Sequence, residues 1–107
     1  MGGNVRRELS YTDKALADLD AITNWLTQPG AGRAARRRLT AVWLAIERPR
    51  EHPCLNPVGQ HSGARELPCD GGYRALYRVT DDTGRDDAAG DVRVLRVFGP
   101  GQSRDHL

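Results

Sequence analysis

The sequence predicts an α+β fold in which an N-terminal strand and an antiparallel hairpin of two helices precede three strands that complete a four-stranded antiparallel sheet. Apolar residues have a period of two before residue 12 and after residue 63, and a helical period between them. The turn residues Gln28-Pro29-Gly30 and Asp70-Gly71-Gly72 separate predicted elements. The chain has 107 residues, and since single cores usually occupy roughly 100–150 residues, one domain over residues 1–107 is expected.

The first half of the chain is expected to form a strand and the helical hairpin. Side chains alternate over Val5–Tyr11, and Thr12 or Ser10 can cap the helix that follows. Apolar positions recur at three- and four-residue steps in both helices, and their short connection forces them antiparallel. The apolar positions of the first helix are Ala15, Leu16, Leu19, Ile22, Trp25 and Leu26. Those of the second, expected from about Ala31 to Arg48, are Ala35, Leu39, Val42, Trp43 and Ile46.

Three strands are predicted in the second half, over Ala64–Leu67, Tyr73–Thr80 and Val92–Phe98. An irregular loop with three prolines precedes them over residues 49–63, and a polar loop over residues 81–91 separates the last two. Alternation gives the middle strand one more apolar face, which is expected to pack under the helices. This face carries Tyr73, Ala75, Tyr77 and Val79.

Positive charge is concentrated in the middle of the chain. The net charge is only +2, but residues 31–80 carry nine arginines against four acidic residues. Fifteen of the sixteen basic residues are arginine, whose planar fork suits phosphate. This distribution favours a phosphate-binding surface or an acidic partner, whereas a coding bias toward arginine explains the total better, though not the clustering. Four of the arginines cluster near the start of the second helix: Arg33, Arg36, Arg37 and Arg38.

The strands also carry arginines. Arg74 and Arg78 lie on the second face of the middle strand, and Arg65 and Arg96 on neighbouring strands can join them. Three or four guanidinium groups on one sheet face would attract phosphate strongly. The alternative is that these arginines form ordinary ion pairs with nearby glutamates and with the aspartates of the polar loop.

The sequence shows neither a membrane span nor a secretory signal. Its longest apolar run, Ala41–Ile46, has six residues, whereas a membrane-spanning helix needs about 20, and the N-terminus has no apolar signal segment. A cytoplasmic protein is therefore expected. Cys54 and Cys69 are expected to be free thiols, and their spacing from His52 and His61 matches no compact zinc pattern.

Three stretches are the most specific part of the sequence. They are Arg65-Glu66-Leu67-Pro68, Gly72-Tyr73-Arg74-Ala75-Leu76-Tyr77-Arg78-Val79 and Val92-Arg93-Val94-Leu95-Arg96-Val97. Together with the preceding strand and helical hairpin, they resemble the RelE/ParE superfamily of type II toxins over nearly the whole chain. The resemblance implies a RelE-like fold and a cognate antitoxin that wraps the toxin and suppresses it.

The resemblance implies one of two mechanisms. RelE-like members bind in the ribosomal A site and cut mRNA, which requires a base for the 2′-OH, cations for the phosphate and an acid for the leaving oxygen. Here Phe98 stands where several members have a His, and Gly101 and Leu107 stand where others have an Arg and a Tyr. ParE-like members instead poison DNA gyrase without a comparable catalytic site, and the ending Ser103–Leu107 resembles tails of that branch.

In the leading hypothesis the chain inhibits translation by ribosome-associated mRNA binding or cleavage. A metal-independent endoribonuclease with an atypical active site is one open alternative, and no metal or cofactor is expected. The candidate catalytic residues are His106, as acid or base, with Arg78 and Arg96. The candidate phosphate- or RNA-binding residues are Arg65, Arg74, Arg104 and Tyr73, the last as a stacking partner that is first of all a core candidate by strand parity.

Three other functions stay open. The chain can be a ParE-like inhibitor of DNA gyrase, a non-toxic binding module of the same fold, or an unrelated RNA-binding α+β domain that lacks an antitoxin. The missing His and Tyr favour gyrase inhibition, whereas the arginine-rich sheet face favours RNA. The expected partners are a cognate antitoxin, which supplies an apolar helix or strand and acidic side chains, and either the ribosome with its mRNA or DNA gyrase.

Overall fold

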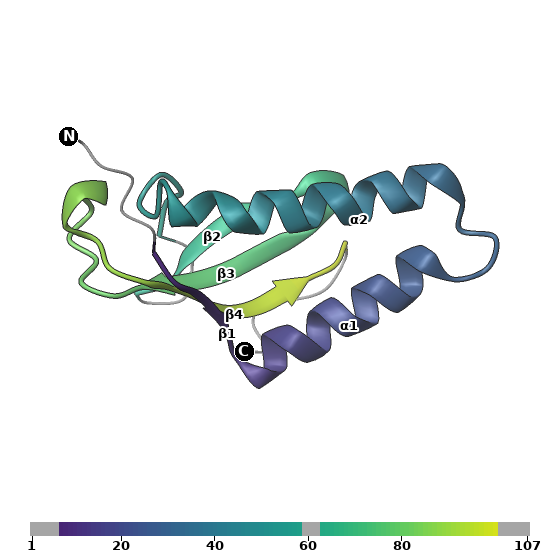
Figure 1. Cartoon of the computed structure of the whole chain (residues 1–107), viewed down its shortest axis with the longest axis horizontal. Coiled ribbons are helices and arrows are strands. Elements are labelled where there is room, and N and C mark those ends of the chain that lie inside the picture. The colour runs from purple at the N-terminus through teal and green to yellow at the C-terminus, as the bar shows by residue number, and fades with distance from the viewer. Residues whose placement is uncertain (1–6, 59–62, 101–107) are drawn as a thin grey trace.

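The computed structural model describes residues 7–58 and 63–100 and has two layers, a helical hairpin packed on one face of a four-stranded sheet (Figure 1). The helices are α1 (Asp13–Thr27) and α2 (Gly32–Glu47), and the strands are β1 (Leu9–Tyr11), β2 (Arg65–Pro68), β3 (Arg74–Val79) and β4 (Val92–Phe98). The predicted fold class and element order are confirmed. Among the described residues, no helix is long and apolar enough to cross a membrane.

The sheet has the strand order β1-β4-β3-β2 and is mixed. β2, β3 and β4 pair antiparallel as predicted, but β1 lies parallel to β4, with Leu9 opposite Val92 and Tyr11 opposite Val94. The expectation of a wholly antiparallel sheet is therefore wrong at this edge. The helical hairpin reverses the chain once and the connection between α2 and β2 reverses it again, so β2 has the direction of β1. The two turns that follow give β4 this direction again.

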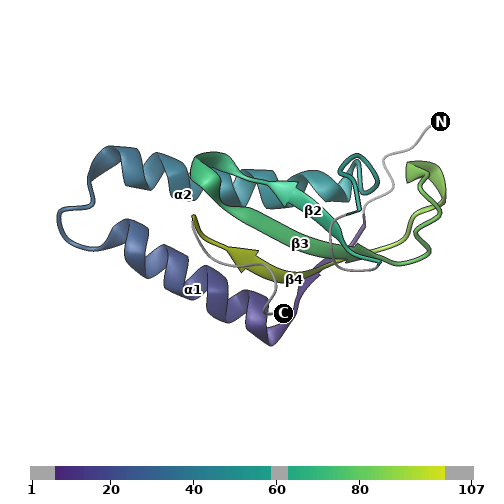
Figure 2. The same ribbon diagram turned by 180° about the vertical axis from the view of Figure 1, so that it is seen from behind.

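The helices cover one face of the sheet, with α1 along β4 and α2 behind β2 and β3 (Figure 2). The core combines Ala15, Leu19, Ile22 and Leu26 of α1, Val42 and Ile46 of α2, and Tyr73, Ala75, Tyr77, Val79, Val92, Val94 and Val97. The predicted inner face of the middle strand is thus confirmed. The prediction for Leu16 and Trp25 is wrong: they are 50% and 65% exposed, because they flank a narrower buried stripe.

A bulge in β4 changes which of its side chains face the helices. Leu76 lies opposite Arg96, whereas the next residue, Tyr77, lies opposite Val94. Leu95 is therefore an extra residue, and the alternation of β4 shifts by one after it. As a result Arg96 shares a face with Leu76, while Val97 returns to the core beside Ala75.

The N-terminal half of α1 closes the edge of β4 that the short strand β1 leaves uncovered. Thr12 donates from its backbone N–H to the Val94 carbonyl at 3.0 Å and from its hydroxyl to the Leu95 carbonyl at 2.7 Å. The same hydroxyl caps α1 by accepting a bond from the Ala15 N–H at 3.0 Å. One turn further along α1, the Asp18 carboxylate accepts the Val97 N–H at 2.9 Å. The N-cap residue Thr12 and the Asp18 side chain of α1 thus take the place of a partner strand.

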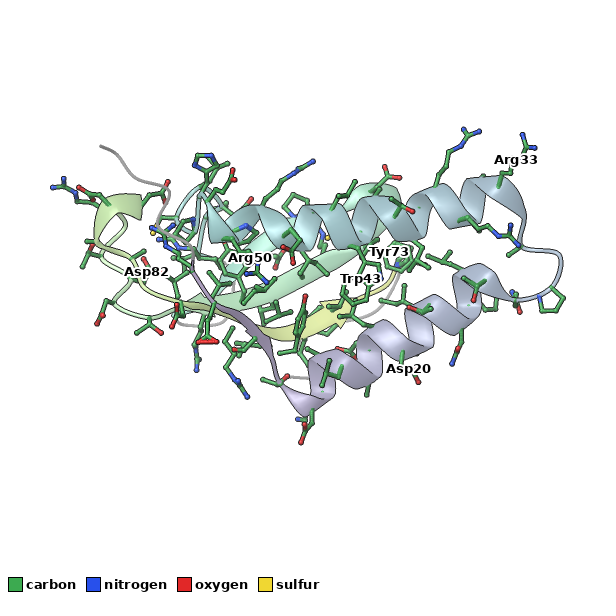
Figure 3. The ribbon with its side chains drawn as sticks, viewed as in Figure 1. Asp20, Arg33, Trp43, Arg50, Tyr73 and Asp82 are labelled. Carbon is green, nitrogen blue, oxygen red and sulfur yellow. The ribbon has the colours of Figure 1, made fainter. Side chains whose placement is uncertain are left out.

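Asp18→Ala is expected to lower the free energy of unfolding by about 2–4 kcal/mol, because it removes a carboxylate that holds both a strand N–H and a largely buried guanidinium. Urea denaturation checks this value. Asp20→Ala is the matched control, since Asp20 is an exposed aspartate on the same helix (Figure 3). Equal losses in the two variants would contradict the role given to Asp18.

Candidate functional site

The sheet face opposite the helices gathers some of the predicted arginines. Arg74 and Arg78 lie on it, as their alternation predicts, and Arg93 of β4 lies directly opposite Arg78. Arg74 is partly exposed and pairs with Glu66 at 3.4 Å across β2 and β3. Arg78 and Arg93 thus place two basic side chains next to each other on this face, although like charges directly opposite one another destabilise a sheet.

Arg65 lies on the other face of the sheet, opposite Tyr77, and is only 8% exposed. Its guanidinium donates to both carboxylate oxygens of Asp82, at 2.8 and 2.9 Å, and to the Asn56 carbonyl at 2.6 Å. The Arg65 guanidinium holds the pKa of Asp82 below its ordinary value. The expectation that Arg65 joins the phosphate-binding face is therefore wrong, because the register places it under the loops on the core side.

The surroundings of Arg65 connect two loops. The Tyr77 hydroxyl donates to the Pro53 carbonyl at 2.8 Å, and the Cys54 N–H donates to the Asp86 carboxylate at 2.8 Å. Burial, and after it the nearby Asp82 carboxylate, raise the pKa of the Cys54 thiol. Residues 49–58 are thus attached to the 80–91 loop by part-buried polar contacts, directly from Cys54 to Asp86 and through Arg65, which bonds both Asn56 and Asp82.

Arg96 lies on the face opposite the helices but is paired at its edge. It donates to the two oxygens of Asp18 at 2.7 and 3.0 Å, and its side chain is 17% exposed. Its guanidinium carbon also lies 5.1 Å from the centroid of the Phe98 ring. Phe98, at the position where RelE-like relatives have a His, is 3% exposed. A buried phenylalanine ring thus occupies the position at which a catalytic histidine would be expected.

The remaining predicted residues are placed as follows. Tyr73 is 5% exposed and belongs to the core, so its ring has no free face for a base. Arg104 and His106 lie outside the described residues, as do Gly101 and Leu107. The arrangement that the structure describes therefore brings together Arg74 and Arg78 and leaves the other candidates buried, paired or outside the described chain.

A second cationic surface lies on α2. Arg33, Arg36, Arg37 and Thr40 line one shallow, open hollow on its outer side. The arginines are exposed, and Figure 3 shows Arg33 pointing away from α1 and the sheet. The arginine cluster was visible in the sequence, but no specific role was predicted for it. The spacing of three and four residues between Arg33, Arg36, Arg37 and Thr40 predicts that their side chains lie on one face of the helix.

The free energy of unfolding is expected to fall at low pH, because the ion pair of Asp82 is lost there. Because the folded-state pKa of Asp82 is lowered, its ion pair stabilises the fold above about pH 4 and is lost as the pH falls further. The difference in free energy of unfolding between the native chain and Asp82→Asn should be constant from pH 7 to pH 5 and shrink at pH 3. Urea denaturation at each pH measures it. A difference that does not change with pH would refute the assignment.

Comparison with known proteins gives one family. The family model of the ParE toxin of the type II toxin–antitoxin system parDE matches residues 9–100. A search of curated proteins finds no match. A solved structure of the chromosomal ParDE toxin–antitoxin system from P. aeruginosa is similar, with 19% identity and a TM-score of 0.66, over 89% of this chain and 97% of that chain.

A second solved structure, the E. coli DinJ–YafQ toxin–antitoxin complex, has 12% identity and a TM-score of 0.53. The match covers 89% of this chain and 93% of that one. At these identities the two structures support the fold, whereas the family model spans most of the sequence. The chain therefore belongs to the ParE family of type II toxins.

Proposed function

We propose that this ParE-family toxin inhibits DNA gyrase and does not cut mRNA. The observation that carries the proposal is the neutralisation of the sheet arginines. Arg65 and Arg96, two of the four strand arginines predicted to hold phosphate, each form a bidentate pair with an aspartate. The family match supports the same target, because ParE-like members of the superfamily are the gyrase poisons.

The chemistry of RNA cleavage explains why this observation favours gyrase inhibition over an RNase mechanism. In the transition state of RNA cleavage, extra negative charge develops on the phosphate. A catalyst must therefore supply cations that point at this phosphate and are not already paired with other anions. A guanidinium held by two carboxylate oxygens is already neutralised and oriented. To bind phosphate, Arg96 must leave Asp18, and the Val97 N–H shares that same carboxylate. Gyrase inhibition needs a binding surface only, so these pairs do not oppose it.

Translation inhibition is the second candidate, and one observation favours it. Arg74, Arg78 and Arg93 share the face opposite the helices, and Arg78 and Arg93 lie directly opposite one another. A toxin that binds mRNA or the ribosome without cutting would use such a positive face. The experiment below includes this candidate as its alternative outcome.

A cognate antitoxin is the expected partner under either mechanism. Among the described residues, the helices expose several large apolar side chains to solvent, and tryptophan is a frequent anchor of protein interfaces. Trp25 is 65% exposed, Leu44 is 63% exposed and Leu16 is 50% exposed. A partner that covers this hairpin with an apolar segment would remove these side chains from water. The resemblance to type II toxins implies an antitoxin that wraps the toxin and suppresses it.

The purified chain is expected to inhibit the supercoiling of relaxed plasmid by gyrase in the presence of ATP, and to leave linear DNA when the reaction is stopped with detergent. Agarose gels measure both products. The same preparation should leave protein synthesis and mRNA intact in a cell-free translation system. Addition of the cognate antitoxin should restore supercoiling, which distinguishes toxin action from a contaminating nuclease.

Codon-spaced mRNA cuts that require ribosomes, with unchanged supercoiling, would overturn the proposal and establish the RNase mechanism. Blocked translation with intact mRNA would equally reject gyrase as the target and would point to binding by the sheet arginines. Arg78→Gln is the informative variant in that case, because Arg78 lies outside the Asp18 and Asp82 pairs.

A further inference from the structure

The outer face of α2 carries a cationic patch that neither the core nor the proposed catalytic alternatives use. We define the α2 patch as Arg33, Arg36 and Arg37, which with Thr40 line an open hollow of about 330 Å³. Positions three, four and seven residues apart lie on one side of a helix. All four residues are exposed.

The patch is uncompensated in the part of the chain that the structure describes. There the three guanidinium groups form no ion pair and no hydrogen bond, whereas Arg50, Arg65, Arg74, Arg85 and Arg96 each pair with a carboxylate. α2 has no acidic residue in its first turn and no side-chain cap. The arginines thus repel one another and the positive end of the helix dipole. This repulsion lowers the stability of the helix start. An arrangement that costs stability in this way indicates a surface that serves to bind an anionic partner.

The position of the patch makes it accessible to a large partner. In both views the ends of α1 and α2 that join at the connecting loop project beyond the sheet (Figures 1 and 2). The α2 patch lies in this projecting part, since α2 begins at Gly32. A single helix with outward-pointing arginines can approach a groove of duplex DNA, which is about 12 Å wide on the major-groove side.

We infer that the α2 patch binds the phosphate backbone of duplex DNA. Arginine forks are suited to phosphate, and three of them along a projecting helix match the regular negative charge of a duplex. The choice of duplex DNA, rather than an acidic protein segment, rests on the proposed function, because duplex DNA is the substrate of gyrase. The patch would then anchor the toxin to the DNA that the enzyme is processing.

The test is the salt dependence of DNA binding by the full chain alone. Fluorescence anisotropy with a labelled 20-base-pair duplex of random sequence should give an association constant that falls with salt, with a slope of log K against log[salt] of about −2.7 for three phosphate contacts. In Arg33→Gln/Arg37→Gln the slope should be smaller in magnitude by about 1.8, and binding at 50 mM salt should weaken at least tenfold.

The matched control is Lys14→Gln/Arg85→Gln, which removes the same net charge from exposed positions outside the patch. It should keep the slope and the affinity within about twofold of the native chain. Arg33→Gln/Arg37→Gln should melt at the same temperature as the native chain or higher, because the substitutions relieve repulsion at the start of α2.

Equal losses in the two double variants would overturn the inference, because binding would then follow net charge only. Tighter patch-dependent binding of a single-stranded RNA or of an acidic peptide than of the duplex would also overturn it. The assay contains no gyrase, so its failure is separate from that of the proposed function. Inhibition of supercoiling without patch-dependent DNA binding would reject only the patch, whereas DNA binding without inhibition would reject only gyrase as the target.

Discussion

The attachment of α1 to the edge of β4 is the constraint on which the rest of the structure depends. β1 pairs with only the first three residues of β4, and the rest of that edge would otherwise present free backbone groups to solvent. Thr12 and Asp18 bind these groups, and Asp18 also binds Arg96. The position of α1 along β4 is therefore fixed by polar contacts as well as by its apolar stripe. The antiparallel connection then fixes α2.

Carboxylate pairing assigns two of the strand arginines to the fold. Arg65 and Arg96 look like phosphate ligands in the sequence, but each is bound by a carboxylate that lies far away along the chain. The same residue type on α2 has no such partner among the described residues. Whether an arginine serves the fold or a ligand is thus decided by the nearest carboxylate. Among the described residues, the three arginines of the α2 patch form no ion pair with a carboxylate.

Local sequence patterns predicted most of the fold. The helical periods, the turn residues and the alternation of the middle strand correctly placed both helices, three strands and the inner residues Ala75 and Tyr77. The parallel pairing of β1 was missed, because it depends on how the helical hairpin returns the chain to the sheet. The bulge at Leu95 was missed as well, since an extra residue in a strand has no sequence pattern of its own.

The candidate site was less predictable for a physical reason. Register decides which face Arg65 occupies, and a shift of one residue reverses the answer. The pairing of Arg96 with Asp18 joins residues separated by 78 positions, so neither residue indicates the other in the sequence. The α2 cluster was visible from its spacing. Its lack of carboxylate partners emerged only when the surrounding residues were placed in space.

The most direct test of this account is a double-mutant cycle on Arg96 and Asp18. Arg96→Gln, Asp18→Asn and the combined variant would be compared with the native chain by urea denaturation. Because the pair is largely buried and bidentate, the account predicts a coupling energy of about 1–3 kcal/mol. A coupling energy near zero would show that Arg96 does not depend on Asp18 and is available to bind phosphate, which would contradict the assignment of this arginine to the fold.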